Sequence, residues 1–161
     1  MSLLTGPRPF VGVSILTLCP RLHPGCVLIS QRLTSPGRGT LQLPGGHLEY
    51  GESFEDCARR ELNEETNLEC TAAPLKLVFV SDSLFPPDDG GPRHYITLLM
   101  KAEINDDALL RWMEPEKNTE WKWIPWTDLK DKNLFTPLRK AVDSLEFNSI
   151  TDMSMEQQNF V

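Results

Sequence analysis

Three carboxylates crowd the second half of a predicted helix, and their spacing points either to a metal site or to a solvated acidic surface. Glu61 lies three residues before Glu64 and four before Glu65, so the three share one side of the helix. Like charges at this spacing destabilise a helix, and the helix dipole disfavours anions near the C-terminal end. An acidic surface explains the cluster as well as a cation site does. Mg²⁺ is the cation that suits such a site, because it prefers oxygen ligands and keeps several waters.

A glycine pair lies just before this helix. Gly45 and Gly46 follow Pro44 at the end of a short extended segment, and such a turn lets backbone groups approach an ion or a ligand closely. Two glycines that lead at a fixed distance into an acidic helix favour the cation site over the plain acidic surface.

The helix that carries the carboxylates is predicted over residues 53–66. Ser53 is a suitable N-cap with Asp56 three residues further on, and Asn67 suits a left-handed C-terminal cap. The face predicted to point inward consists of Phe54, Ala58 and Leu62, with Cys57 beside them.

Apolar, β-branched runs predict the strands that must hold this helix in place. Phe10–Leu18 and Cys26–Gln31, which are joined by a segment rich in proline and glycine, are predicted to form a hairpin. Further elements are predicted as strands at Leu41–Leu43, Leu75–Ser81, His94–Ile104 and Glu120–Ile124, a loop at Phe85–Pro92 and a last helix at Pro137–Phe147. This order predicts an α/β fold with a mixed sheet covered by helices, not a regular βαβ repeat.

Length and composition predict one soluble domain over residues 1–161, with flexible ends at residues 1–8 and 151–161. The net charge of −7 argues against binding to a nucleic-acid backbone, and no apolar run is long enough to span a membrane. The four cysteines form no C-x-x-C pair, so they are predicted to be buried in a reducing, cytoplasmic compartment. Three tryptophans are predicted to belong to the core: Trp121, Trp123 and Trp126.

Residues 46–68 resemble the Nudix box, G-x5-E-x7-R-E-U-x-E-E-x-G-U, in which U is bulky and apolar. The matching residues are Gly46, Glu52, Arg60, Glu61, Leu62, Glu64, Glu65 and Leu68. Asn67 stands where the family has its last glycine, and asparagine also tolerates the left-handed conformation. The resemblance implies a Nudix hydrolase, with an α/β/α sandwich in which a mixed sheet lies between helices.

The resemblance also implies roles for these residues. Glu61 and Glu65 would be the principal Mg²⁺ ligands, with Mn²⁺ as a substitute, and the backbone carbonyl of Gly45 would join them. Glu64 would be a further ligand or the base that activates water. Glu116, in a later loop, is the other candidate for this base, and an exposed turn residue is its competing interpretation. The box also implies a salt bridge, between Glu52 and Arg60, that fixes the loop against the helix.

Similarity outside the box covers roughly residues 10–140 and resembles the small nucleoside triphosphate diphosphatases of the mammalian thiopurine-nucleotide diphosphatase and mutator-type subgroup. It rests on residues 41–49, His94-Tyr95, residues 114–118 and the pair Trp121 and Trp123. The subgroup implies hydrolysis of nucleotides, including oxidised purine nucleotides such as 8-oxo-dGTP, to monophosphate and pyrophosphate, a role in nucleotide pool sanitation, and a homodimer.

The same resemblance implies which residues contact the substrate. They are Arg32, Gly46 and His47 near the phosphates, and Gln42, Leu43, Thr97, Phe135 and Leu138 around the base. Phe135 taken alone is equally well explained as a core aromatic. Two other functions stay open: a Nudix hydrolase of another diphosphate, such as a dinucleotide, nucleotide sugar or prenyl diphosphate, and a nucleotide-binding protein without catalysis. No P-loop motif occurs, so kinase-type phosphoryl transfer is not supported.

Overall fold

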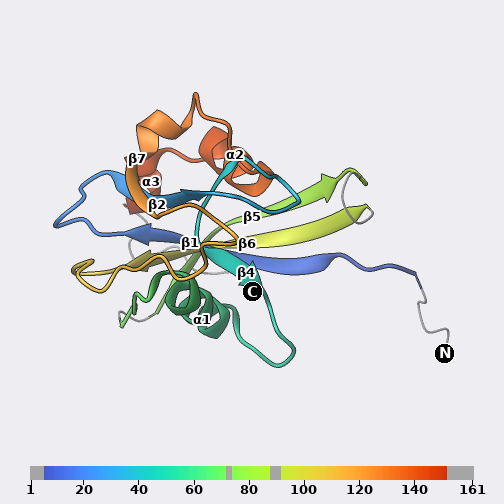
Figure 1. The fold of residues 1–161 in the computed structure, drawn as a ribbon, viewed down its shortest axis with the longest axis horizontal. Helices are drawn as coiled ribbons and strands as arrows, with labels where there is room; N and C mark the ends of the chain where they lie inside the picture. The colour runs from blue at the N-terminus through green and yellow to red at the C-terminus, as the bar shows by residue number, and fades with distance from the viewer. Residues whose placement is uncertain (1–5, 72–73, 88–91, 152–161) are drawn as a thin grey trace.

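The computed structural model describes residues 6–71, 74–87 and 92–151, and its strands form two sheets (Figure 1). The larger sheet has the strand order β4-β1-β6-β5, and the smaller has the order β3-β2-β7. The strands are β1 (Phe10–Leu18), β2 (Cys26–Gln31), β3 (Leu41–Gln42), β4 (Gly45–His47), β5 (Lys76–Phe85), β6 (Arg93–Glu103) and β7 (Lys122–Pro125). The larger sheet is mixed, because β1 runs parallel to β6, whereas β4 and β5 are antiparallel to their neighbours.

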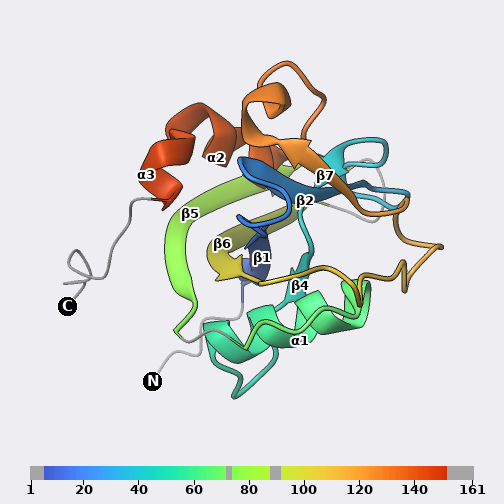
Figure 2. The same ribbon diagram turned by 90° about the vertical axis from the view of Figure 1, so that its left-hand side faces the viewer.

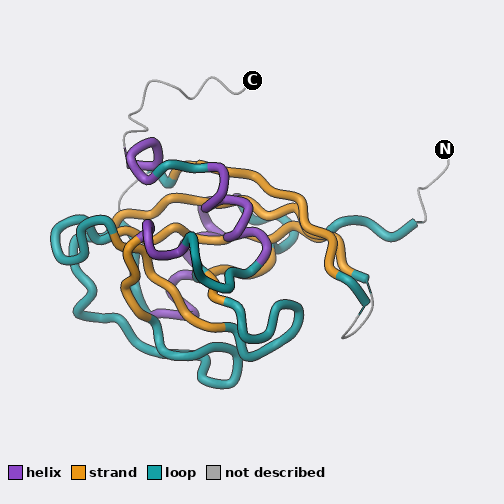
Figure 3. Tube along the Cα trace, turned by 90° about the horizontal axis from the view of Figure 1, so that it is seen from above, coloured by secondary structure: helices purple, strands orange, loops and turns teal. Residues whose placement is uncertain are grey.

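Helix α1 (Phe54–Thr66) and the smaller sheet cover opposite faces of the larger sheet, as Figure 2 shows. Helix α1 covers one face. The smaller sheet lies over the other face together with the 3₁₀ helix η1 (Trp126–Leu129) and helices α2 (Thr136–Ser144) and α3 (Phe147–Thr151). Loops, drawn in teal in Figure 3, surround the strands. The expected α/β fold with a mixed sheet between helical layers is confirmed.

Two apolar cores result from this arrangement, one on each face of the larger sheet. Along β1, Val13 and Ile15 belong to the core under α1, which contains Leu62. Leu16 and Leu18, from the other face of the same strand, pack toward the smaller sheet and α2. A strand buried on both faces is apolar at consecutive positions, and this accounts for the continuous apolar run that predicts β1.

The structure confirms the bounds expected for β1 and β2 but not the hairpin expected between them. β1 pairs with β4 and β6, whereas β2 pairs with β3 and β7 in the other sheet. The turn residues between the strands predict a reversal of the chain, but they carry no information about which sheet each strand joins. Because β1 is apolar on both faces, it lies in the centre of the sheet that is covered on both sides.

Among the other expected elements, the boundaries differ most at two places, and they shift by one or two residues elsewhere. β5 continues through Phe85, which pairs with Arg93, so the loop expected at Phe85–Pro92 begins later, and part of that loop (88–91) lies outside the described residues. The expected last helix is divided, because α2 ends at Ser144 and Leu145 adopts an extended backbone before α3 begins. Most of the end segments expected to be flexible also lie outside the described residues.

Helix α1 has the caps that its sequence predicts. The Ser53 hydroxyl accepts a hydrogen bond from the Asp56 backbone N–H at 3.0 Å, and Asn67 ends the helix in the left-handed conformation at φ 60°. Ala58 and Leu62 are buried as expected, but Phe54 is 44% exposed, so the predicted apolar face was wrong at its first position. Phe54 is the first residue of the helix.

The remaining whole-chain expectations were tested in part. Cys19, Cys57 and Cys70 are buried, Cys26 is half-buried, and all four thiols are free. None of the helices in the described part of the chain is long and apolar enough to cross a membrane. Trp121 and Trp126 are buried, which confirms them as core residues, and Trp123 packs against the core under α1.

Candidate active site

A cavity of about 520 Å³ joins the acidic side of α1 to the space between the two sheets. All eight residues expected to contact substrate line it: Arg32, Gln42, Leu43, Gly46, His47, Thr97, Phe135 and Leu138. The carboxylates of Glu61, Glu64 and Glu65 line the same cavity, as does Arg60. The fold therefore brings together residues that are more than a hundred positions apart in the chain, although their roles in binding stay a prediction.

The glycine pair lets two carboxylates lie directly against the backbone of β4. Gly45 has φ 154°, a conformation that side chains disfavour, and a Cβ there would overlap the Val13 carbonyl. A Cβ at Gly46 would overlap the carboxylate of Glu61. The Gly45 N–H donates a hydrogen bond to Glu65 Oε2 at 2.9 Å. Glu61 and Glu65 are thus held at one turn, on the wall of the cavity.

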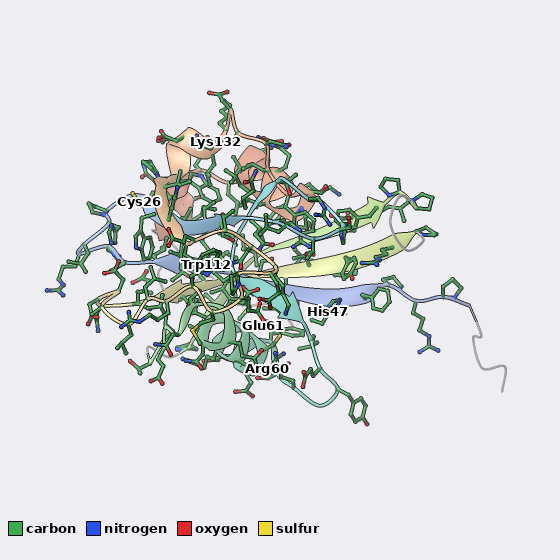
Figure 4. All side chains as sticks on the ribbon, in the orientation of Figure 1. Cys26, His47, Arg60, Glu61, Trp112 and Lys132 are labelled. Atoms are coloured by element: carbon green, nitrogen blue, oxygen red, sulfur yellow. The ribbon has the colours of Figure 1, made fainter. Side chains whose placement is uncertain are left out.

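Arg60 fixes this turn against the helix, as the Nudix box implies. Its Nε and Nη2 donate to the two oxygens of Glu52 at 2.8 and 3.0 Å, and its Nη2 also donates to the carbonyl of His47. The remaining amino group, Nη1, donates to Glu61 Oε1 at 2.8 Å. The hydrogen bonds from Arg60 lower the pKa of Glu52 to about 2, so the pair is fully ionised at neutral pH. Figure 4 shows Arg60 and Glu61 on the side of α1 that lies toward β4.

The carboxylates are placed where negative charge is unfavourable. Glu65 is only 8% exposed, and burial raises its pKa to about 8, while the hydrogen bond from Gly45 opposes the shift. Burial also raises the pKa of Glu61, against the effect of Arg60. Repulsion from Glu114 adds to both shifts. A cation bound here would relieve this repulsion and keep both carboxylates ionised.

The donor atoms fit Mg²⁺ in type, but they do not form a closed cage. In the described ranges, no three His, Cys, Asp or Glu side chains are grouped closely enough to hold a metal ion by themselves. Glu61 and Glu65 flank the glycine turn, whereas the Glu64 side chain is 54% exposed and lies 3.3 Å from Arg60 Nη1. Mg²⁺ is commonly held by one or two carboxylates with waters and substrate phosphates completing its shell, and this open arrangement meets that requirement.

The loop between β6 and β7 supports the acidic end of α1. The backbone N–H of Arg111 donates to the Thr66 carbonyl at 2.9 Å, and that of Met113 donates to the Glu65 carbonyl at 3.4 Å. The indole N–H of Trp121 also donates to the Glu65 carbonyl, at 3.1 Å. These donors satisfy carbonyls that end a helix without partners, so the last turn of α1 keeps its shape without a basic side chain.

The same loop brings Glu114, not Glu116, to the cavity. Glu114 lines the cavity together with Lys117, whose ammonium group lies 2.8 Å from Glu114 Oε1. Glu116 is exposed and is absent from the cavity lining. The sequence prediction named Glu116 as a candidate base, whereas the structure places Glu114 of the same segment, residues 114–118, at the cavity. The catalytic role of either carboxylate stays a prediction. Only the backbone path of the loop distinguishes the two, because both residues are glutamates in the same polar segment.

Aromatic side chains form the opposite wall of the cavity. Phe135 stacks on Phe85 with ring centres 5.3 Å apart, and the Arg32 guanidinium lies 4.3 Å from the centre of the Phe135 ring. Arg32 Nη1 also donates to Gln42 Oε1 at 2.5 Å, and burial lowers the pKa of Arg32. Tyr95, with its hydroxyl 3.0 Å from His47 Nε2, completes this wall. Phe135 is therefore part of an aromatic wall rather than an isolated stacking platform, and sequence reasoning missed Phe85 and Tyr95.

Most of the chain is similar in sequence to known proteins. The NUDIX domain family matches residues 8–145 of this chain. The chain belongs to the Nudix family. The RNA pyrophosphohydrolase of Novosphingobium aromaticivorans is 27% identical to it over 146 residues, which cover 84% of this chain and 86% of that protein. The ADP-ribose pyrophosphatase of Methanocaldococcus jannaschii is 32% identical over 78 residues, which cover 48% of this chain and 43% of that protein.

Solved structures agree with the Nudix assignment. The crystal structure of the MutT Nudix hydrolase from Burkholderia pseudomallei has a TM-score of 0.73 to this chain at 24% identity, and the match covers 87% of this chain and 100% of that one. At this identity the likeness shows the shared fold. With the family established and the box present apart from its last glycine, this chain is a Nudix hydrolase, an enzyme that cleaves a diphosphate bond.

Proposed function

We infer that this Nudix hydrolase is a Mg²⁺-dependent diphosphatase of nucleoside triphosphates, which it converts to monophosphate and pyrophosphate, and that modified purine nucleotides such as 8-oxo-dGTP are among its substrates. One observation carries the proposal: a single cavity joins the carboxylates of α1 to an aromatic and polar compartment between the sheets. A diphosphate needs the first part, and a base needs the second.

The carboxylates that line the cavity would have two roles in this reaction, metal binding and proton transfer. Glu61 and Glu65 would hold Mg²⁺ beside the glycine turn, and Arg60 keeps Glu61 in place. When bound, Mg²⁺ supplies charge neutralisation at the diphosphate and a water of lowered pKa. Glu64 or Glu114 would take the proton from the attacking water, because both carboxylates line the cavity. Glu114 replaces Glu116 in this role because Glu116 does not line the cavity.

The experiment is a substrate panel measured with and without Mg²⁺. The panel contains nucleoside triphosphates with ordinary and oxidised bases, ADP-ribose, a dinucleotide, a nucleotide sugar and a prenyl diphosphate, and released phosphate and pyrophosphate are measured separately. We expect pyrophosphate from the triphosphates, and only with the metal. Release from another class while every nucleoside triphosphate stays intact would overturn the proposal.

A matched pair of variants separates the metal site from general acidity. Glu61→Gln removes one predicted ligand, whereas Glu69→Gln removes an exposed carboxylate just beyond α1. We expect the first variant to be inactive with Mg²⁺ and the second to behave as the wild type. Activity of Glu61→Gln at the wild-type level would show that the metal is held elsewhere, or that none is needed.

ADP-ribose is the second candidate substrate. It is favoured by the similarity to the ADP-ribose pyrophosphatase, which extends over less than half of either chain. The RNA pyrophosphohydrolase relative raises an RNA end as a further possibility, but the net charge of −7 disfavours contact with a polynucleotide. The proposed homodimer and cytoplasmic location rest on the resemblance and the cysteine pattern, and sedimentation and cell fractionation would test them.

A further inference from the structure

One row of residues crosses three adjacent strands beneath the cavity. Gly12 of β1 pairs with Thr97 of β6, and Thr97 pairs with Ser81 of β5. All three residues line the cavity. In the neighbouring row toward the core, Leu99 pairs with Phe79, so the sheet face changes there from apolar to small and polar. The hydroxyls therefore form a polar floor inside a largely apolar layer.

The two residues that carry these hydroxyls are largely buried, and the hydroxyls face the cavity. Ser81 is 5% exposed and Thr97 is 7% exposed. Among the residues that the structure describes, neither side-chain hydroxyl makes a hydrogen bond to another residue. Unlike the Ser83 hydroxyl, which is fully enclosed, these two hydroxyls are open to the cavity. Because both side chains face the cavity, a ligand in the cavity is the partner that the geometry offers.

Gly12 independently indicates that something approaches this floor closely. Glycine weakens the interior of a strand, and it often marks a bulge or the close approach of a ligand. The pairing of β1 with β6 is continuous from Phe10 to Leu18, so no bulge is present. A Cβ on Gly12 would meet its nearest neighbours at 3.7–3.9 Å, which is ordinary contact distance. Neither the backbone nor the packing requires glycine here. A side chain at this position would instead fill part of the cavity that Gly12 lines.

The position and surroundings of the floor define the group that would bind. Neighbouring strands are about 4.8 Å apart, so Thr97 lies roughly 10 Å from the glycine turn of β4 and Ser81 roughly 14 Å from it. These distances are comparable to the distance between the diphosphate and the base in an extended nucleotide. The walls beside the floor are apolar or aromatic: Leu43, Phe79, Phe85, Leu99 and Leu138. A flat ring can pack against these apolar walls, and hydrogen-bond donors and acceptors on its edge can bond to the hydroxyls of the floor.

We propose that Ser81, acting with Thr97 above the open floor at Gly12, is a specificity-determining residue that hydrogen-bonds the polar edge of the substrate's base. The inference rests on the proposed function and adds residues to it, because Ser81 and Gly12 belong to segments of the sequence outside the box. Each hydroxyl donates one hydrogen bond and accepts two, so the pair can match a base edge that presents both kinds of group.

The test compares two serines on the same strand. Ser81→Ala removes a cavity hydroxyl, whereas Ser83→Ala removes a buried hydroxyl that does not line the cavity. The readout is the ratio of KM for the best nucleoside triphosphate to KM for a base-free deoxyribose triphosphate. We expect Ser81→Ala to raise this ratio about fivefold, as loss of one net hydrogen bond would, and Ser83→Ala to leave it unchanged. An unchanged ratio in Ser81→Ala, or an equal rise in both variants, overturns the proposal.

A second variant and a binding measurement keep the test independent of turnover. Gly12→Val fills the floor, and we expect it to weaken binding of a nucleoside monophosphate in calorimetry at least tenfold, with unchanged circular dichroism. Ser81→Ala should weaken the same binding about fivefold. If no nucleoside triphosphate is hydrolysed but monophosphate binding depends on Ser81, the proposed function fails and the base subsite stands. If nucleotides are hydrolysed and binding is indifferent to both changes, the subsite fails and the function stands.

Discussion

The two ends of the cavity are built in different ways. The acidic end comes from one continuous segment, residues 45–66, in which a glycine turn and one helix hold the carboxylates. The base end is assembled from four strands and the start of α2, with residues as far apart as Gly12 and Leu138. The acidic end carries the Nudix box, whereas the base end is drawn from segments outside the box. The two ends should therefore respond differently to substitution.

The largest effect is expected when the acidic end loses a ligand. Glu65→Gln keeps the size of a buried side chain but removes its charge, and loss of several kcal/mol of transition-state stabilisation corresponds to a roughly 10³-fold fall in kcat. Steady-state pyrophosphate release at saturating Mg²⁺ measures it. If Glu65→Gln raised only KM, Glu65 would act in substrate binding rather than in catalysis, which would contradict the distinction between the two ends.

A smaller but still large effect is expected for the loop carboxylate. Glu114→Gln should lower kcat about 10- to 100-fold, because general acid–base catalysis contributes at least this much. Glu116→Gln is the matched control, since its carboxylate is exposed and absent from the cavity lining. Parallel pH profiles of kcat for the two variants would measure the difference. A larger loss in Glu116→Gln would restore that residue as the candidate base.

The acidic end should also make stability depend on pH and metal. The pKa of Glu65 is raised to about 8 in the folded state from an ordinary 4.5, so its contribution to stability is fully present below pH 4.5 and is lost as the pH rises through 8. Without Mg²⁺, the free energy of unfolding should therefore decrease over this range by a few kcal/mol at most.

Two changes should remove this pH dependence. Glu65→Gln should flatten the profile, and added Mg²⁺ should restore stability at pH 8 because a ligand that binds only the folded state stabilises it. Urea unfolding at several pH values measures both. A wild-type profile that rises between pH 4.5 and 8 because of Glu65 would contradict the assigned burial.

The smallest effect is expected beside the base end. The Ser83 hydroxyl is buried without a partner among the described residues. Ser83→Ala removes this group, so we expect the protein to become more stable by about 1 kcal/mol. Thermal unfolding of Ser83→Ala and Ser81→Ala in parallel measures the change. Destabilisation of Ser83→Ala by a similar amount would show that its hydroxyl has a partner, and would weaken the contrast between the two serines.

The sequence predicted the acidic end well because its information is local. Helix caps depend on residues that are close along the chain, so the caps at Ser53 and Asn67 were confirmed. The Glu52–Arg60 salt bridge, which the Nudix resemblance implies, is also present. The hairpin between β1 and β2 was wrong for the complementary reason. The pairing of strands depends on which apolar faces become buried against other elements, and this depends on the whole fold.

By itself, the sequence therefore determined the chemistry: a carboxylate cluster on a capped helix behind a glycine turn, with the spacing of a Nudix box. Only the tertiary structure decided which loop glutamate reaches the cavity, and which other side chains line it. Glu114 rather than Glu116 lines the site because of the path of one loop. Ser81 lies opposite Thr97 because of the register between β5 and β6. Register and loop path are set by packing between distant segments, and no short stretch of sequence encodes either.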